Sequence, residues 1–436
     1  MSGRAAPSGE RGLEAADDRL YRAQIAYLFE RSRFYRQKLT AAGFADAEKA
    51  GGLERIAELP FTEKDELRRT CSEDDPIGTH LAADMADVVR VYSTSGTTGA
   101  PSYIPLTGED VASWVEISSR SYGASGIASG QRIVSTYNAG PFVAGVALDT
   151  FARLGLCHVP VGSGSTERLV TAVRLLKPQI LAMTPSYALH AAEWAAARGI
   201  ETRGSSVRYI LVAGEPGGGE AAMRRRIEDA WGARVTEAMG IGDISISLWG
   251  ECPHQTGMHF SGAGFVHAEL IDPVSGAVLA MEDGAEGELV YTHLRHRAAP
   301  LLRFLSRDHV RVTAGRCACG RTSPRVRCIG RTDDMLIVRG VNLFPTAVRE
   351  VVAEFEPEVG GVIAIRPRRR GVRQEPPLPV TVEMAEGAAA APDLAEHISR
   401  RLREALLVTT EIDLVRHATL ARSDYKSKIV DWSSAT

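Results

Sequence analysis

The sequence predicts an α/β protein with a large N-terminal α/β domain of layered sheets and a small C-terminal α+β domain. Three observations lead to this fold class. The chain has 436 residues, which is too long for one ordinary hydrophobic core. Short apolar strands alternate with helical segments from about residue 88 to 300, as in a largely parallel sheet. The last hundred or so residues change to a mixed helix and strand pattern.

Local periodicity defines the elements of the N-terminal part. A helix is expected over 19–39, where Leu20, Ile25, Leu28 and Phe29 share one face. Strand and helix patterns then alternate through 131–137, 151–161, 168–185, 207–216 and 220–232. Residues 264–294 indicate β structure, with turn signals at Asp272-Pro273 and Asp283-Gly284.

The C-terminal domain is expected to span 333–436, after a core domain over 1–332. It begins with a helix pattern at 345–355, followed by strand patterns at 360–366 and 379–385. A second helix is predicted from Leu394, Ile398, Leu402 and Leu406, which recur at a spacing of four.

Composition excludes several classes of partner. With 44% hydrophobic and 24% charged residues, the chain is ordinary globular protein, and its net charge of −3 gives no reason to expect nucleic acid or an anionic membrane. No apolar run is long enough to span a membrane, and the polar N-terminus lacks the core of a signal peptide, so a cytoplasmic location is expected. Six cysteines are too sparse for a disulfide scaffold.

A loop rich in hydroxyl groups and glycine follows the strand pattern at 88–91. Its hydroxyl donors are Ser93, Thr94, Ser95, Thr97 and Thr98. Gly96 and Gly99 allow backbone N–H groups to turn inward on an anion. This chemistry predicts a phosphate cradle that differs from the Walker pattern, since no Gly-Lys-Ser/Thr follows. Taken alone, the loop is also compatible with a solvated turn.

Five motifs in order resemble adenylate-forming enzymes, the superfamily of acyl-CoA synthetases, carrier-domain adenylation proteins and luciferases. They are TSGTTGAPS (94–102), VAGEP (212–216), MGIGD (239–243), GELVYTHLRHRAAPLLRFLSRD (287–308) and GRTDDMLIVRGVNLFP (330–345). The last is very similar to the hinge motif of the phenylacetate–CoA ligase-like branch. The resemblance implies a mobile C-terminal lid domain, ATP, Mg²⁺ and coenzyme A as cofactors, and a small carboxylic acid as substrate. For this branch it also implies a homodimer.

The resemblance gives each motif a role in nucleotide binding. The loop from Ser93 to Gly99 would hold the β- and γ-phosphates and Asp308 the ribose hydroxyls, while the planar guanidinium of Arg331 would reach a phosphate. Gly214, Glu215, Pro216, Met239 and Gly240 would contact AMP. Asp243 replaces the usual Glu of the family as the expected Mg²⁺ ligand, and Ala100 replaces a lysine.

The resembling family also has a catalytic lysine near its C-terminus. In ARSDYKSKIVDW (421–432) the alignment from the left indicates Lys426, which we favour, and the alignment from the right indicates Lys428. The hinge position of the family corresponds to Asp333. A frayed basic tail is the alternative interpretation of the lysines.

Cysteine and histidine spacing predicts a structural zinc site. Cys252, His259, Cys317 and Cys319 supply the thiolate-rich set of four that tetrahedral zinc favours, and some members of the resembling branch carry such a pattern. His254 competes with His259 as a ligand, and Cys328 is a spare. Free thiols are the alternative.

The segment after the strand at 131–135 is expected to form the pocket for the acyl group of the substrate. Tyr137, Asn138, Ala139, Gly140 and Pro141, together with Gly240 and Ile241, are expected to line the acyl pocket. The amide of Asn138 could pair with a substrate hydroxyl, although a helix-capping role is equally compatible with the sequence.

Further segments, YNAGPFVAG, GSGSTERL and TPSYALHAAEWA, resemble 2-hydroxyisobutyrate–CoA ligases. We therefore expect an AMP-forming acid–CoA ligase for a short branched 2-hydroxy acid. The alternatives are an arylacetate ligase of the phenylacetate type, an adenylation protein that loads a carrier-protein thiol, and a degenerate nucleotide-binding protein.

Overall fold

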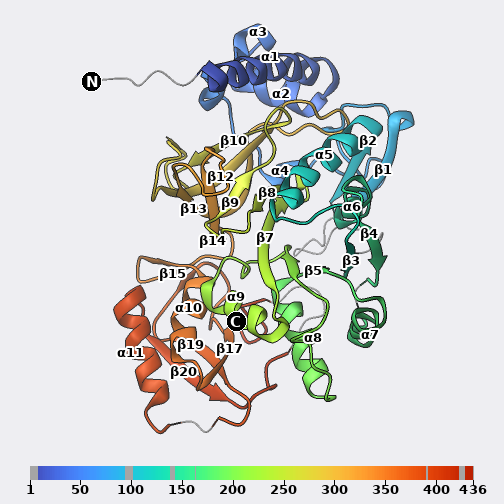
Figure 1. Ribbon diagram of the computed structural model, residues 1–436. Helices are drawn as coiled ribbons and strands as arrows, with labels where there is room; N and C mark the ends of the chain where they lie inside the picture. The colour runs from blue at the N-terminus through green and yellow to red at the C-terminus, as the bar shows by residue number, and fades with distance from the viewer. Residues whose placement is uncertain are drawn as a thin grey trace.

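The computed structural model describes residues 8–93, 102–137, 143–162, 164–388, 391–421 and 428–435. Within these residues a 12-stranded sheet forms the body of the molecule, and two three-stranded sheets form the C-terminal part. In Figure 1 the N-terminal helices (blue) and the C-terminal part (orange to red) lie at opposite ends of this body. The predicted fold class is confirmed.

The large sheet joins a parallel half to an antiparallel half at one strand. Its order is β11-β10-β12-β13-β14-β9-β8-β7-β6-β5-β3-β4. The parallel half contains β3 (Arg132–Ser135), β4 (Cys157–Pro160), β5 (Ile180–Met183), β6 (Tyr209–Val212) and β7 (Arg234–Ile241). The antiparallel half contains β8 (Ser245–Glu251), β9 (Met258–Phe260), β10 (Val266–Ile271), β11 (Val278–Leu279), β12 (Glu286–His293), β13 (Phe304–Thr313) and β14 (Arg325–Arg331). β1 (Val88–Ser93) and β2 (Tyr103–Thr107) form a separate antiparallel pair.

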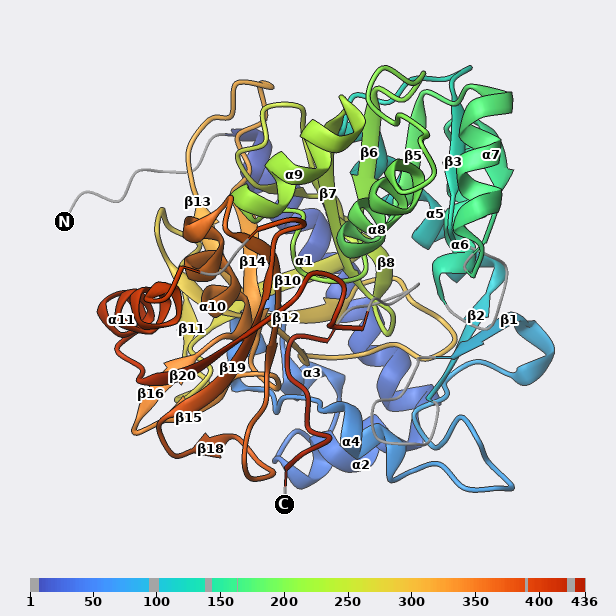
Figure 2. The ribbon, with the colours of Figure 1, turned by 90° about the horizontal axis from the view of Figure 1, so that it is seen from below.

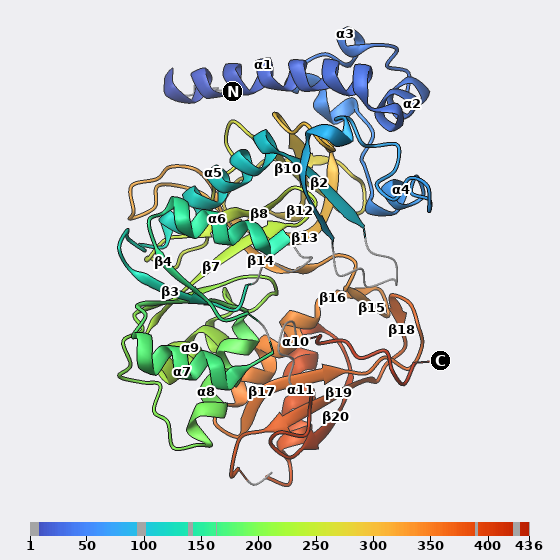
Figure 3. The same cartoon turned by 90° about the vertical axis from the view of Figure 1, so that its right-hand side faces the viewer.

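Helices cover both faces of the parallel half. α7 (Thr166–Leu176), α8 (Pro185–Ala196) and α9 (Ala221–Trp231) pack on one face, where Val134, Leu181 and Ile210 point. α5 (Gly108–Ala124) and α6 (Val146–Arg153) pack on the other, against Ile133 and Ile180. Because successive strand residues point to opposite faces, the strands are apolar throughout, as the sequence pattern indicated. Figure 2 shows α7, α8 and α9 along these strands, and Figure 3 shows α5 and α6 on the opposite side.

The N-terminal helix differs from the prediction in two respects. It begins at Ser8 as α1 (Ser8–Arg31), and a second helix, α2 (Arg33–Ala41), follows a break at Ser32. The Ser32 hydroxyl accepts a hydrogen bond from the N–H of Tyr35 at 3.4 Å, so this residue caps a new helix instead of continuing the first. The short elements α3 (Ala47–Ala50), α4 (Lys64–Arg68), η1 (Leu53–Glu58), η2 (Met85–Asp87) and η3 (Val143–Gly145) complete this part.

The C-terminal part has a hydrophobic core of its own. One small sheet has the order β16-β15-β18 and the other β17-β19-β20. Their bounds are β15 (Leu336–Val338), β16 (Val341–Leu343), β17 (Val359–Ile365), β18 (Arg373–Gln374), β19 (Leu378–Met384) and β20 (Thr410–Val415). The helices are α10 (Pro345–Val352), followed by η4 (Ala353–Phe355), and α11 (Leu394–Leu406). The predicted helices and strands are confirmed here, while the domain boundary at 332/333 stays a prediction.

Candidate active site

Three predicted motifs meet at the carboxyl edge of the parallel strands. Tyr137 follows β3, the segment from Gly214 to Pro216 follows β6, and the segment from Met239 to Asp243 ends β7. Because parallel strands end at one edge of a sheet, residues far apart in sequence are brought together there, where open α/β sheets bind their ligands.

A buried carboxylate and an arginine lie side by side on two antiparallel strands. Asp308 on β13 is the cross-strand neighbour of Arg331 on β14, and Arg331 Nη1 donates to Asp308 Oδ1 at 3.1 Å. Arg331 Nε and Nη2 each donate to Asp333 at 2.9 Å. Burial raises the pKa of the Asp308 carboxyl to about 6, although the Arg331 guanidinium opposes this shift. The pKa of Arg331 is raised because both carboxylates outweigh its own burial.

The loop after β6 is anchored by its glutamate. The N–H of Ser186, at the start of α8, donates to Glu215 Oε1 at 2.8 Å. A carboxylate is stabilised at a helix N-terminus, so this contact fixes the loop against the start of α8. Gly214 has φ of +96°, which side chains other than glycine rarely adopt.

Gly240 sits where β7 meets β8 closely. A Cβ at this position would lie 2.4 Å from the backbone of Ile246, so only glycine is accommodated. The strand register shifts between Met239 and Ile241, which leaves the Gly240 backbone exposed. The predicted AMP and acyl contacts of Met239, Gly240 and Ile241 therefore fall on an irregular strand end.

Asp243 has a cationic partner that the sequence did not reveal. Lys64 Nζ donates to Asp243 Oδ2 at 2.7 Å, and the Asp243 side chain is 9% exposed. Lys64 begins α4, whose neighbour Thr62 is pinned beside β13 by hydrogen bonds with Arg303 and Leu305. Arg68 at the end of α4 donates to Ser102 at 3.2 Å, directly after the predicted phosphate loop. No pattern in the sequence of α4 indicates this position, because it arises from tertiary packing alone.

Several predicted site residues cannot be placed. Thr94 to Gly99, Asn138 to Pro141 and Lys426 lie outside the described residues, as does Ala100. Ser93 and Tyr137 are described at the ends of β1 and β3. Lys428 is exposed, and its charge acts on Asp334, whose pKa is raised by burial and by Asp333.

Four metal-ligating side chains converge at β9 and the loop after β13. Cys252, His259, Cys317 and Cys319 offer ligand atoms that all lie within 4.8 Å of one another. Cys252 Sγ is 3.7 Å from Cys317 Sγ, and Cys319 Sγ is 3.4 Å from His259 Nε2. His254 does not belong to this cluster of described residues.

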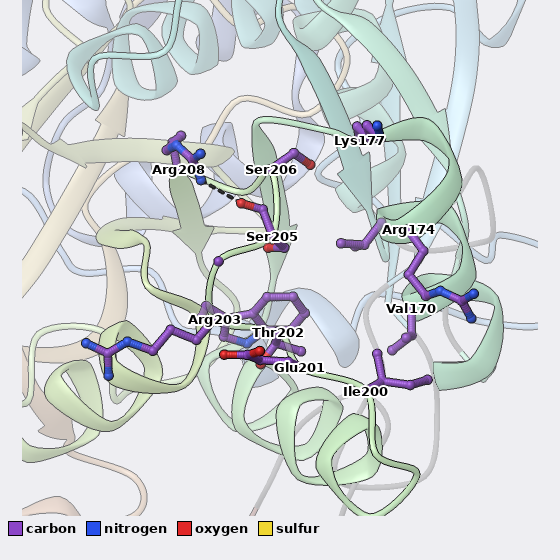
Figure 4. Close-up of a pocket in the computed structure, with 13 residues that line it drawn as sticks. Val170, Arg174, Lys177, Ile200, Glu201, Thr202, Arg203, Ser205, Ser206 and Arg208 are labelled. Atoms are coloured by element: carbon purple, nitrogen blue, oxygen red, sulfur yellow. Dashed lines mark hydrogen bonds between the residues drawn. The ribbon is translucent and has the colours of Figure 1, made fainter.

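A separate cavity of about 500 Å³ opens at the other edge of the parallel sheet. Its lining residues precede β5, β6 and β7 instead of following them. Arg174 and Arg203 extend to opposite sides of this cavity in Figure 4. Its charged groups therefore do not converge on one ligand, and we do not regard it as the active site.

Comparison with known proteins identifies the family. The family model described as AMP-binding enzyme matches residues 12–293, and the AMP-binding enzyme C-terminal domain matches 340–431. This chain belongs to the AMP-binding enzyme family. A phenylacetate-coenzyme A ligase of Thermus thermophilus is 34% identical over 431 residues, covering 94% of each chain. These matches confirm the predicted superfamily, branch and enzyme class, an AMP-forming acid–CoA ligase that uses ATP and coenzyme A.

Solved structures add information about conformation. 2-Hydroxyisobutyryl-CoA ligase in the postadenylation state, in complex with 2-HIB-AMP, superposes with a TM-score of 0.88 at 28% identity, covering 98% of this chain and 90% of the other. The same protein in the thioesterification state gives a TM-score of 0.70 over the same shares. Both structures are of the same ligase, and the higher TM-score shows that the arrangement of this chain is closer to the postadenylation state. Among the described residues, every helix is too short or too polar to traverse a bilayer.

Proposed function

We propose that this chain activates a short branched 2-hydroxy acid, such as 2-hydroxyisobutyrate. The acid's carboxylate oxygen attacks the α-phosphorus of ATP and pyrophosphate leaves. The sulfur of coenzyme A then attacks the acyl carbonyl, so that a thioester forms and AMP leaves. The likeness at a TM-score of 0.88 to a ligase that holds its 2-hydroxyisobutyryl adenylate is the observation that carries this proposal.

The charged groups at the strand ends suit nucleotide binding. Asp308, held by Arg331 at 3.1 Å, would accept hydrogen bonds from the ribose hydroxyls, and Arg331 would exchange this contact for a phosphate. Ser93 to Gly99 would hold the outer phosphates, and Gly214 to Pro216 with Met239 and Gly240 the adenine. The acyl group would lie against Tyr137, Ile241 and the segment from Asn138 to Pro141.

Asp243 is the proposed Mg²⁺ ligand. Its Oδ2 accepts from Lys64, and Oδ1 accepts no hydrogen bond from any described residue. One open carboxylate oxygen beside a cation suits an ion that prefers oxygen ligands and substrate phosphates, so the residues fit Mg²⁺. When bound, Mg²⁺ neutralises phosphate charge, while Lys64 balances the charge of Asp243 itself.

Lys426 or Lys428 would neutralise the reacting carboxylate and α-phosphate, and Asp333 would be the hinge. The side chain of Asp333 takes two hydrogen bonds from Arg331, so the hinge residue is linked directly to the proposed phosphate ligand. Backbone rotation at Asp333 would therefore also change the surroundings of Arg331.

The cysteine cluster fits structural zinc. Tetrahedral zinc with Zn–S bonds of about 2.3 Å places two sulfurs about 3.8 Å apart, and Cys252 and Cys317 are separated by 3.7 Å. We expect about one zinc per chain after native purification, measured by mass spectrometry of the metal content. Cys319→Ser should lose it and Cys328→Ser should retain it. Metal-free protein with reactive thiols would support the alternative.

The curated relatives favour a second candidate substrate, phenylacetate, because they are phenylacetate-coenzyme A ligases. Turnover of 2-hydroxyisobutyrate, isobutyrate and phenylacetate should be compared at equal ATP and coenzyme A, with the thioester identified by mass spectrometry. We expect the 2-hydroxy acid to be preferred over isobutyrate, because a buried partner for its hydroxyl would otherwise stay unpaired. A strong preference for phenylacetate would refute this substrate.

The same assay addresses the remaining alternatives. Adenylate formation without transfer to free coenzyme A would indicate a carrier-protein thiol as the acceptor. Nucleotide binding without pyrophosphate release would indicate a degenerate site. Light scattering of the purified chain would test the homodimer that the branch implies.

A further inference from the structure

A buried ion pair crosses the junction between the C-terminal part and the body. Arg349 of α10 donates from Nε to Glu220 Oε2 at 2.8 Å and from Nη2 to Glu220 Oε1 at 2.5 Å. The two side chains are 10% and 9% exposed. A two-pronged contact between arginine and a carboxylate is strong and orients both groups, and its burial shields it from water.

The same guanidinium also holds the loop that follows β6. Arg349 Nη2 donates to the carbonyl of Pro216 at 3.2 Å. Pro216 ends the segment proposed to contact adenine, and Glu220, four residues later, immediately precedes α9. Arg349, which belongs to the C-terminal part, therefore donates hydrogen bonds to both ends of the segment 216–220.

The segment 216–220 is confined on two sides. On the side of the body, a Cβ on Gly219 would lie 2.8 Å from Glu237 Oε2, and on the side of the C-terminal part, a Cβ on Gly217 would lie 3.4 Å from Arg349 Nη2. Arg224 donates from Nε to the carbonyl of Gly218 at 2.8 Å. Gly217, Gly218 and Gly219 thus lie between the side chains of Glu237 and Arg349. Without Arg349, the segment loses its contact on the side of the C-terminal part.

The buried charges around this segment are balanced only when Arg349 is present. Arg224 pairs with Glu251 at 2.7 Å, and Arg349 pairs with Glu220. Burial and the neighbouring Glu251 raise the pKa of Glu237 to about 7, which keeps a third negative charge out of the cluster at lower pH. Loss of Arg349 would leave an unmatched buried carboxylate next to the segment proposed to contact adenine.

We propose that Arg349 is a positioning residue for the adenylation step, which organises the segment 216–220 only while the C-terminal part is docked as in this structure. The kinetic consequences of this proposal rest on the function proposed above. The superposition falls from 0.88 to 0.70 between the postadenylation and thioesterification states of the relative. A comparable rotation here parts Arg349 from Glu220, because the two side chains belong to different parts of the chain.

Other contacts between the C-terminal part and the body lie nearer the hinge. The Thr346 hydroxyl donates to the carbonyl of Ile329, and Phe344 stacks on His309 with ring centroids 4.9 Å apart. Ile329 lies four residues before Asp333, close to the axis of rotation. Glu220 lies outside the hinge motif and belongs to the body, so its contact with Arg349 depends on the docking of the C-terminal part.

Arg349→Ala tests the role in each half-reaction. We expect pyrophosphate exchange into ATP to slow about tenfold with a raised KM for ATP, and AMP to bind about fivefold more weakly. Thioester formation from supplied acyl-adenylate and coenzyme A should stay within about twofold. Arg349→Lys keeps the charge without the planar fork and should recover part of the loss.

Arg401→Ala is the matched control. Arg401 pairs with Glu354 at 2.6 Å on the exposed surface of the C-terminal part, so this variant loses an arginine of the same part without affecting the junction. Equal loss of both half-reactions in Arg349→Ala, unchanged AMP binding, or the same defect in Arg401→Ala would overturn the inference. Glu220→Gln, which keeps the side-chain size, provides the test if Arg349→Ala fails to fold.

Hydrogen exchange gives a readout that needs no substrate. In the full chain, Arg349→Ala should speed exchange of the backbone amides of 217–224 about fivefold or more, while Arg401→Ala leaves them unchanged. Unchanged exchange in Arg349→Ala would contradict the proposal. If the wild-type chain activates no acid but binds AMP, the proposed function fails, and the AMP affinity and amide exchange still decide the role of Arg349.

Discussion

Two buried arginine–glutamate pairs of this molecule have similar chemistry and different consequences. Arg303 donates to both oxygens of Glu269, at 3.1 and 2.9 Å, as Arg349 does to Glu220. Arg303 also donates to the carbonyls of Ala57 and Leu59, so it fastens the N-terminal helical segment to the body. Both partners of the first pair belong to the body, whereas the second pair spans the junction with the C-terminal part, for which rotation is proposed. Burial of an ion pair therefore does not by itself indicate function, and the two pairs differ in which parts of the chain they join.

The largest effect is expected when the pair within the body is broken. In Arg303→Ala the Glu269 carboxylate stays buried without its cation, and the free energy of unfolding should fall by about 3–5 kcal/mol. Urea unfolding measures this loss, and the ratio of the two half-reaction rates should not change. Arg311→Ala, which breaks an exposed pair with Glu286, should change stability by less than about 1 kcal/mol. A loss in Arg303→Ala as small as this would remove the contrast between the two pairs.

Removing Arg331, the arginine beside Asp308, should affect activity more than stability, which is the opposite of what is expected for Arg303→Ala. Arg331 is 33% exposed, and the Asp308 carboxyl, whose pKa burial already raises to about 6, can take up a proton when its cation is lost, so Arg331→Ala should cost less stability than Arg303→Ala. Its proposed phosphate contact strengthens as charge develops, so the adenylation rate should fall about 10²- to 10³-fold. Pyrophosphate exchange measures this loss, and Arg331→Lys should recover part of it. An adenylation rate within a few-fold of wild type would show that Arg331 is only a structural partner of Asp308.

The sequence predicted the fold more completely than the site. Strand and helix patterns are local, so the alternation through β3 to β7 and the C-terminal helices could be recognised from periodicity. The motif order located Asp308 and Arg331, and the register of β13 and β14 then brought them together. Lys64 and Arg349 could not be found in this way, since α4 and α10 reach the site through packing between distant segments.

The break between α1 and α2 was missed for a different reason. Apolar residues continue with helical spacing on both sides of Ser32, so periodicity indicates one helix. The serine hydroxyl instead caps the second helix, and it also donates to the backbone carbonyl of His80 at 3.5 Å. A single capping residue within an apolar pattern is a weak signal unless the tertiary contact is known.

The raised pKa of Asp308 predicts opposite pH effects on activity and stability. The carboxyl titrates at about 6, so below this pH it loses its acceptor role and kcat/KM for ATP should fall about tenfold per unit. Between the ordinary value of 3.8 and about 6 the folded chain binds more protons than the unfolded one, so this group's contribution to stability falls as pH rises. Asp308→Asn should abolish both dependences. A pH profile in the variant identical to that of wild type would assign the titration to another group.

The smallest effect is expected from Lys64, a cation whose partner Asp243 belongs to the body of the molecule. Lys64→Ala leaves Asp243 without its ammonium, and the added negative charge should raise the KM for ATP about three- to tenfold, with little change in stability. Lys38→Ala is the matched control. Lys38 of α2 pairs at 2.5 Å with Glu66 of α4, the helix that also carries Lys64, but Lys38 does not contact Asp243. Initial rates at varied ATP and Mg²⁺ distinguish the two variants. If Lys38→Ala raises the KM for ATP as much as Lys64→Ala does, the effect comes from the position of α4 and not from the charge next to Asp243.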